Sequence, residues 1–451
     1  MVTRQGPQAI PSDETLAAAA RSRDRSAATA SVADTARVAV EVLAPTLAGG
    51  VIKRRPRAMA LADRLQLDRP AVRLLQRLRA RYDGRPVRLR LPRSVTVLLN
   101  HSDAGALLAG TPSPFTPASL EKRATLSHFQ PHGVLISDSG TRAARRELNV
   151  KVLEPGRELH ELAAPWAARI AQRIGELATT KLDWDTFNTR WWQLVRENTL
   201  GGDTAEDREL TDLLDRLRLD ANWAYVHPKR KQLRSRFLEL VGQQVALDRP
   251  GSLAAALNAT PGAPGTDPAG QVPHWLFAFD AAGIVTFRTL ALLASHPQAA
   301  ARARAELTDL ENPQQLPFLR ACVLESVRLW PTTPALLRES VEDTAWGRQG
   351  TTLLVFTPFF HRDGQRLPYA DRFEPDIWLD GRAADEPALV PFSAGPGACP
   401  GRDVVLFTAS TVLANLLRQH RFSLLGKELR PGALPATLNH FTLRFAAEPA
   451  S

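Results

Sequence analysis

The sequence predicts a mainly α-helical fold of the α+β class, in which a helical bulk carries small β-sheets. Three observations support this prediction. Apolar residues recur with a helical period through most of residues 141–425. Short apolar segments typical of strands cluster towards the two ends of the chain. Finally, 44% of the residues are hydrophobic and 23% are charged, so the chain has enough apolar material for a sizeable core.

Composition excludes several classes of protein. The 451 residues include only two cysteines, Cys322 and Cys399, which excludes a disulfide scaffold and any four-cysteine metal or iron–sulfur site. The net charge is +10, but no nucleic-acid-binding motif accompanies it. The sequence contains no run of about 18 uninterrupted apolar residues, so it predicts no transmembrane helix. The N-terminus lacks the apolar core of a signal peptide. We therefore expect a cytoplasmic protein that binds neither nucleic acid nor membranes.

The N-terminal part of the chain predicts a tail, a helix, a hairpin and a loop. Residues 1–35 are polar and rich in Ala, Arg and Ser, which predicts a disordered tail, with a single domain over residues 36–451. A helix is expected over 69–81, and two strands at 87–91 and 95–99 predict a β-hairpin. Residues 110–140 are rich in Pro, Ser, Thr, Gly and His, which is typical of a long loop.

The remaining elements follow from periodicity and from turn residues. A Pro/Gly/Ala-rich linker is expected over 254–270. Helices are expected at 141–151, 157–177, 184–200, 206–219, 230–247, 273–295, 297–309, 316–330 and 403–417. Short strands are expected at 336–342, 352–356, 420–425 and 437–446.

The segment Pro391–Gly401 is the strongest chemical signal in the sequence. It reads Pro-Phe-Ser-Ala-Gly-Pro-Gly-Ala-Cys-Pro-Gly, and a helical run starts directly after it. The backbone N–H groups and the dipole at a helix N-terminus favour a thiolate at Cys399. A thiolate is a soft metal ligand and one of the axial ligands of haem iron. Taken alone, the segment also fits a buried structural thiol in a Gly/Pro turn.

This segment resembles the haem-binding loop of the cytochrome P450 family, which reads Phe-x-x-Gly-x-Arg/His-x-Cys-x-Gly. Phe392, Gly395, Cys399 and Gly401 match that pattern. Gly397 stands where the family has Arg or His. Because the family residue there donates to a haem propionate, the resemblance implies that another cation takes over this role.

Further segments strengthen the resemblance, which covers roughly residues 50–446. Glu325 and Arg328 resemble the family's Glu-x-x-Arg helix, and Asp371–Pro375 resembles its Arg-Phe-x-Pro segment. His361-Arg362-Asp363 resembles a third short family segment. The resemblance implies that Glu325, Arg328 and Arg372 form a structural network.

The long helix expected at 273–295 resembles the family's distal helix, which carries an acid and an alcohol that supply protons. The spacing from the end of the helix puts the acid at Asp280 and the alcohol position at Ala281, so that the threonine is lost. A rival register, Ala282–Thr286, keeps a threonine at Thr286. The residues alone also allow Asp280 to be a helix-face acid paired with an arginine.

The resemblance also implies cofactor and substrate contacts. Arg338 and Arg145 would bind the haem propionates, although Thr141 replaces the histidine that usually precedes Arg145 by four positions. The substrate pocket would be lined by the 110–140 loop and by Phe277, Ala278, Ala281, Ala282, Leu336 and Leu337.

The function implied is that of a soluble haem-thiolate monooxygenase, of the kind used in bacterial secondary metabolism. Haem b would lie between the helix around Asp280 and the Cys399 loop. A monomer would oxidise a small organic substrate with O₂ and two electrons from a separate partner, an acidic ferredoxin or flavodoxin with its reductase. Two alternatives stay open: an atypical haem-thiolate enzyme (peroxide-driven oxidation, oxidative coupling, dehydration or rearrangement), and a non-enzymatic haem- or ligand-binding protein.

Overall fold

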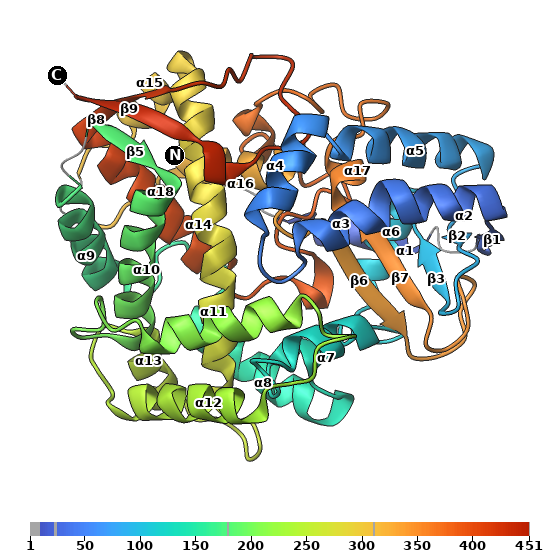
Figure 1. Ribbon diagram of the computed structural model, residues 1–451, viewed down its shortest axis with the longest axis horizontal. Coiled ribbons are helices and arrows are strands. Elements are labelled where there is room, and N and C mark those ends of the chain that lie inside the picture. Colours follow the sequence, from blue (N-terminus) through green and yellow to red (C-terminus); the bar gives the residue numbers. More distant parts are fainter. Residues whose placement is uncertain (1–9, 22–24, 178–179, 310–311, 451) are drawn as a thin grey trace. The chain divides into compact units, whose positions relative to one another are not determined.

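The computed structural model describes residues 10–21, 25–177, 180–309 and 312–450. The chain divides into two compact units, each with its own sheet and helices (Figure 1). Unit 1 comprises residues up to 120 together with 324–399 and 430–439, and unit 2 comprises residues 121–323, 400–429 and 440–451. The single domain expected over 36–451 stays a prediction.

Unit 1 is built on a six-stranded sheet with the strand order β1-β2-β3-β7-β6-β4. The strands are β1 (Ala28–Thr29), β2 (Val87–Arg88), β3 (Val95–Val97), β4 (Phe115–Thr116), β6 (Ala335–Ser340) and β7 (Thr352–Phe356). The hairpin predicted at 87–99 is present, because β2 pairs antiparallel with β3. Strands β6 and β7 also pair antiparallel, so Leu337 lies opposite Leu354.

Helices of unit 1 cover this sheet (Figure 1). They are α1 (Asp13–Arg21), α2 (Val32–Val38), α3 (Ala44–Gly49), α4 (Pro56–Leu65), α5 (Asp68–Arg81), α6 (His101–Ala109) and α17 (Thr357–His361). Helix α5 buries Leu74, Leu75 and Leu78, which are spaced as one helix face, in the same core as the β7 residues Leu353 and Val355.

The N-terminal segment differs from the predicted disordered tail. Residues 1–9 and 22–24 of that tail lie outside the described residues, but Asp13–Arg21 forms α1 and Ala28–Thr29 pairs with β2. Helix α1 buries Leu16 and Ala19, and it packs against α6. The segment is polar on average, so its composition does not predict that Leu16 and Ala19 are buried against other elements.

Unit 2 is mainly helical and carries a three-stranded sheet. The sheet has the order β5-β9-β8, formed by β5 (Lys181–Asp183), β9 (Arg444–Pro449) and β8 (His420–Leu424). The helices are α7 (Leu120–Leu126), α8 (Ser139–Leu153), α9 (Ala163–Gly175), α10 (Trp184–Leu200), α11 (Glu209–Ala221), α12 (Lys231–Ala246), α13 (Leu253–Ala259), α14 (Val272–Ser295), α15 (Pro297–Ala305) and α18 (Arg402–Gln419). Helix α16 (Pro317–Leu329) leads from unit 2 into unit 1.

Helix α14 is the long central helix of unit 2, and α10 and α18 pack beside it (Figure 1). It contains the one candidate membrane span among the described residues: 269–295 has a mean hydropathy of 1.6, but 78% of that apolar window is buried inside the protein. Its apolar surface is therefore used in packing, as in the core helix of a globular unit.

Two segments expected to be irregular are partly regular. Residues 110–140 contain β4, α7 and a short 3₁₀ turn, Val134–Ile136. The linker expected over 254–270 overlaps α13, whose N-cap Ser252 accepts a hydrogen bond from the Ala255 N–H. The predicted strand at 437–446 begins later, at Arg444. In the first two cases short polar or small residues gain order from tertiary partners that periodicity does not show.

A buried ion pair links α16 to the segment that follows α17 in unit 1. The Arg328 guanidinium donates to both carboxylate oxygens of Glu325, at 2.8 and 2.6 Å. It also donates to the carbonyl oxygens of His361, Tyr369, Ala370 and Arg372. Glu325 accepts from the Glu374 N–H and the Trp378 indole. Arg372 thus joins the predicted network through its backbone carbonyl, while its side chain is exposed.

The imidazole of His361 makes unit 1 sensitive to acid. Nε2 of this buried ring accepts a hydrogen bond from the Val390 N–H at 3.0 Å. Burial, and then the charge of Arg328, lower the pKa of His361 to about 3, against 6.5 as its ordinary value. Between these two pH values the unfolded chain binds the extra proton and the folded chain does not, so stability falls as the pH falls.

We expect His361→Gln, which keeps an acceptor but does not titrate, to flatten this acid dependence. Below pH 6.5 the difference should approach about 1.4 kcal/mol per pH unit. Urea unfolding of both proteins between pH 7.5 and 4 measures it. The variant must be compared with the wild type, because Asp103 also contributes to the pH dependence of stability. Burial raises the pKa of Asp103 to about 6, so its contribution has the opposite sign. Parallel curves would contradict the assignment.

Candidate functional site

The Cys399 loop of unit 1 folds back on itself through short backbone hydrogen bonds. The Cys399 N–H donates to the Phe392 carbonyl at 2.8 Å, and the Ala398 N–H donates to the Gly395 carbonyl at 2.9 Å. Cys399 and Phe392 remain partly exposed. The cysteine stands three residues before the first residue of α18. The loop therefore presents a thiol close to the start of a helix, as the sequence predicts.

Gly395 is a residue that this loop requires. Its φ is +59°, which favours glycine. A Cβ at this position would lie 2.7 Å from the Leu108 carbonyl oxygen at the end of α6. Any side chain here would push the loop away from α6.

Arg338 lies beside the loop and is buried. Its Nε donates to Thr111 Oγ1 and its Nη2 to Ser393 Oγ, both at 3.1 Å. A Cβ added to Gly397 would lie 2.9 Å from the same Nη2. Because Gly397 has no side chain, the Arg338 guanidinium has room beside it. Arg338 thus supplies a cation next to residue 397, where the resemblance leads one to expect Arg or His.

In unit 2, one face of α14 is less buried than the rest of the helix. His274, Phe277, Ala278 and Ala281 are all partly exposed, and their spacing places them on one face. We call these four residues the α14 stripe. The Phe129 ring lies 5.5 Å from the Phe277 ring, so the 110–140 segment contacts the stripe as expected. Ala282, expected in the pocket, is buried away from this face.

Two polar side chains lie at the N-terminal end of the stripe. Gln130 is fully buried, and its Oε1 is 3.0 Å from His274 Nδ1. Burial, and then the charge of Lys122, lower the pKa of His274 to about 4, so the ring is neutral at pH 7. Sequence reasoning missed both residues, because nothing in their local pattern distinguishes them from other polar residues.

Asp280 is held in an ion pair. Its Oδ2 accepts from Nη2 of Arg218, a fully buried α11 residue, at 2.5 Å, and the same guanidinium lies 5.4 Å from the Phe277 ring centre. The sequence allowed such a pairing but did not identify the arginine. The Asp280 carboxylate is therefore already engaged by a buried cation.

Thr286 and Gly283 have structural roles in unit 2. Thr286 is fully buried, and its hydroxyl donates to the Ala282 carbonyl at 2.8 Å. The Trp191 indole donates to the Phe279 carbonyl at 2.8 Å, and a Cβ at Gly283 would lie 2.8 Å from that indole nitrogen. Neither residue of the rival register lies on the α14 stripe.

The other predicted contacts are distributed as follows. Arg145 of α8 donates to Ser137 Oγ at 2.8 Å and to the Thr266 carbonyl at 3.2 Å. Gly401 has room beside it, since its Cβ would meet Leu153 at 3.8 Å. Leu336 is buried in the core of unit 1 and Leu337 is partly exposed. Both leucines pack in or against the core of unit 1, and their place in a substrate pocket stays a prediction.

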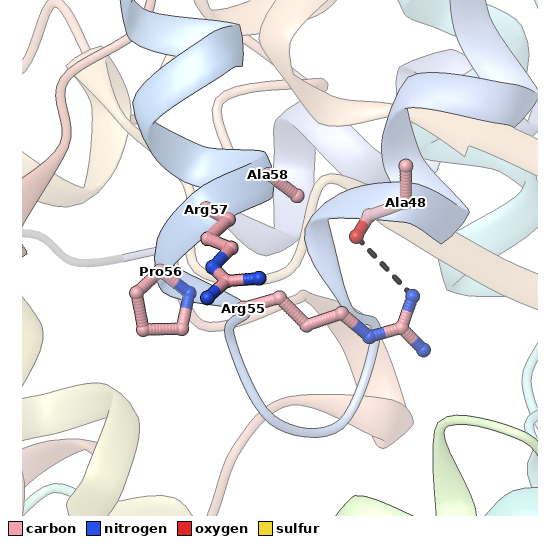
Figure 2. A pocket seen from close by; sticks show the side chains of 5 residues that line it. All are labelled: Ala48, Arg55, Pro56, Arg57 and Ala58. Atoms are coloured by element: carbon pink, nitrogen blue, oxygen red, sulfur yellow. Dashed lines mark hydrogen bonds between the residues drawn. The ribbon is translucent and has the colours of Figure 1, made fainter.

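A separate hollow of about 520 Å³ opens at the turn between α3 and α4 (Figure 2). It is lined by Ala48, Arg55, Pro56, Arg57 and Ala58. Arg55 Nη1 donates to the Ala48 carbonyl at 3.3 Å, which braces the turn. None of the predicted site residues lines this hollow.

Comparison with known proteins relates the C-terminal part of the chain to one family. The sequence profile of the cytochrome P450 family matches residues 279–438, which include Glu325, Arg328 and the Cys399 loop. Over these residues the chain is similar to cytochrome P450 proteins. The crystal structure of cytochrome P450DA heme domain shares the fold, with a TM-score of 0.66 over 85% of this chain and 94% of that one, at 17% identity.

Curated relatives match this chain over part of their length only. Probable cytochrome P450 4s3 of Drosophila melanogaster is 34% identical over 140 residues, which are 30% of this chain and 28% of the relative. Cyclooctat-9-en-7-ol 5-monooxygenase of Streptomyces melanosporofaciens is 30% identical over 171 residues, which are 34% of this chain and 37% of that enzyme. This chain thus aligns with about a third of each relative.

Haem b is the cofactor of cytochrome P450 proteins, and unit 1 fits it. The partly exposed thiol of Cys399 would supply a soft ligand for the iron. Gly397 forms a cradle that a Cβ would fill, next to the buried Arg338 cation. Cys399 would therefore hold the iron and Arg338 a propionate, the roles that the resemblance implies for both residues.

Gly397→Ala tests the relation between this glycine and Arg338. The new Cβ would displace the guanidinium, and we expect the variant to lose haem roughly tenfold faster, since a charge-assisted hydrogen bond weakens. Transfer of haem to excess apomyoglobin measures the rate. Gly401→Ala is the matched control, because its Cβ makes an ordinary contact. Equal rates of haem loss in the wild type, Gly397→Ala and Gly401→Ala would contradict the proposed role of Gly397.

Proposed function

We propose that this chain is a haem-thiolate monooxygenase that oxidises a small organic substrate with O₂ and two electrons from a separate redox partner. The observation that carries the proposal is the Cys399 loop, which holds a partly exposed thiol beside a glycine cradle and a buried arginine. When bound, haem b supplies the iron at which O₂ is activated. Cys399 would act as the thiolate ligand, and Arg338 would orient the group through a propionate.

Residues of α14 and of the 110–140 segment would bind the substrate and determine how protons are supplied. The α14 stripe and Phe129 offer an apolar surface for the substrate, as ligand sites commonly do. Asp280 is the nearest acid to the stripe in sequence, but its carboxylate is engaged by Arg218. We therefore place Ala281, rather than Thr286, at the oxygen-side position, with ordered water or the substrate as the proton source.

The partner and the location are part of the same proposal. A net charge of +10 suits an acidic ferredoxin or flavodoxin, and the electron-transfer rate should then fall as salt is added. We place the protein in the cytoplasm, as a monomer. One relative is named for oxidising an alcohol, cyclooctat-9-en-7-ol, which supports a neutral oxygenated substrate for this chain as well.

The first experiment is the absorption spectrum of the reduced protein exposed to carbon monoxide. A strongly red-shifted Soret band would support haem bound by the Cys399 thiolate. A band at the ordinary position would mean that the thiolate is protonated or displaced. A protein that takes up no haem would overturn the proposal and leave only the shared fold.

The Asp280–Arg218 pair favours a second candidate, an atypical haem-thiolate enzyme driven by peroxide. Such chemistry tolerates an ion-paired acid and a missing hydroxyl at Ala281. Turnover with hydrogen peroxide, but not with O₂ and a redox partner, would support it. For the monooxygenase, Ala281→Thr is expected to raise the fraction of electrons that reaches product, measured as product formed per reductant consumed. Unchanged coupling would argue for delivery by the substrate itself.

A further inference from the structure

Gln130 and His274 leave one donor and one acceptor unused at the end of the α14 stripe. Among the described residues, Gln130 Nε2 is buried and has no hydrogen-bond partner. A buried unpaired donor is unfavourable, and native proteins rarely keep one without a ligand or water to satisfy it. The Gln130 carbonyl is occupied by His274 Nδ1 at 3.0 Å, so the unused group is the amide N–H.

The same contact fixes the state of His274. Because a carbonyl oxygen only accepts, the ring proton lies on Nδ1, and Nε2 carries a lone pair. Within the described part of the chain, Gln130 is the sole hydrogen-bond partner of this ring. The residue as a whole is partly exposed and lies on the same helix face as Phe277 and Ala281. An acceptor nitrogen is thus presented beside the unused Gln130 donor.

We propose that Gln130 and His274 bind a neutral hydroxyl group of the substrate, which would accept from Gln130 Nε2 and donate to His274 Nε2. Phe129 and Phe277, with ring centres 5.5 Å apart, would contact its apolar body. The ligand class is therefore a compact apolar alcohol. This inference rests on the proposed function only where it calls the ligand a substrate; the binding site itself requires no turnover.

The charges around the stripe argue against an anionic ligand. A neutral His274 offers no cation, and the Arg218 guanidinium is engaged by Asp280 at 2.5 Å and by Asp215 at 3.4 Å. A carboxylate would meet the charge of Lys122, which reaches His274, but its oxygens only accept and could not donate to His274 Nε2. A hydroxyl meets one donor and one acceptor and leaves neither unsatisfied.

Three probes of one shape test the site: 2-adamantanol, 2-adamantanone and adamantane, with affinities measured by calorimetry on the full-length holoprotein. We expect the alcohol to bind roughly tenfold tighter than the hydrocarbon. The ketone should fall between them, since it accepts from Gln130 but cannot donate to His274. Equal affinities for all three probes, or no binding of the alcohol, would overturn the proposal.

Variants then assign the preference to the two residues. Gln130→Met conserves volume and should reduce the alcohol preference roughly fivefold, and His274→Leu should abolish the gap between alcohol and ketone. Phe129→Leu is the control, because it should weaken all three probes alike. An unchanged preference in Gln130→Met would refute the assignment. If either variant fails to fold, the wild-type comparison still decides.

The two proposals fail separately. Loss of the red-shifted carbon monoxide band with an intact alcohol preference would reject the monooxygenase and keep the site. A red-shifted carbon monoxide band without any preference for the alcohol would reject the Gln130–His274 site and leave the monooxygenase proposal standing.

Discussion

Replacing Cys399 by serine is expected to abolish the red-shifted carbon monoxide band of the reduced protein. A serine hydroxyl at this place is not a soft ligand and stays protonated at neutral pH, so any haem retained would give an unshifted band. Monooxygenase activity should fall below detection with it. Difference spectra of purified protein, normalised to haem content, measure the effect.

The second cysteine provides the control for that experiment. Cys322 is fully buried within α16, and Cys322→Ala should keep both the band and the activity. If Cys322→Ala lost the red-shifted band and Cys399→Ser kept it, the assigned ligand would be wrong.

Removing Arg328 is expected to destabilise the protein by about 3–5 kcal/mol, since it leaves the Glu325 carboxylate buried and uncompensated. The loss also strips four backbone carbonyls of their donor. For that reason a double replacement by leucine should not restore stability, in contrast to isolated buried pairs. Urea unfolding of Arg328→Leu measures the loss.

Arg372→Ala is the matched control. Its side chain is exposed and only its backbone carbonyl meets Arg328, so the change should stay within about 0.5 kcal/mol. A large loss in Arg372→Ala, or a small one in Arg328→Leu, would show that the cation of the network has been misassigned.

Sequence periodicity predicted the long amphipathic elements and missed the short ones. The expected helix at 184–200 coincides with α10, because a helical period is joined there to an Asp183 N-cap. Helix α6 was missed, since it is short and buried on all sides, and its Gly105 weakens a helix prediction. That glycine is needed for packing: a Cβ there would lie 2.7 Å from Pro387.

The residues of the candidate site also divide into those that the sequence predicted and those that it did not. The Cys399 loop and Arg338 could be predicted, because their chemistry is written in contiguous motifs. Arg218, Gln130 and His274 could not, because only the folded chain decides which polar side chain meets α14.

The contact between Trp191 and Gly283 carries a consequence for the evolution of this chain. The indole occupies the volume that any side chain at 283 would need, so the two positions cannot drift independently. A lineage that acquires alanine at 283 must first have replaced the tryptophan at 191 by a smaller residue. Descendants of this protein should therefore show correlated substitution at the two positions, with the order of events fixed by sterics.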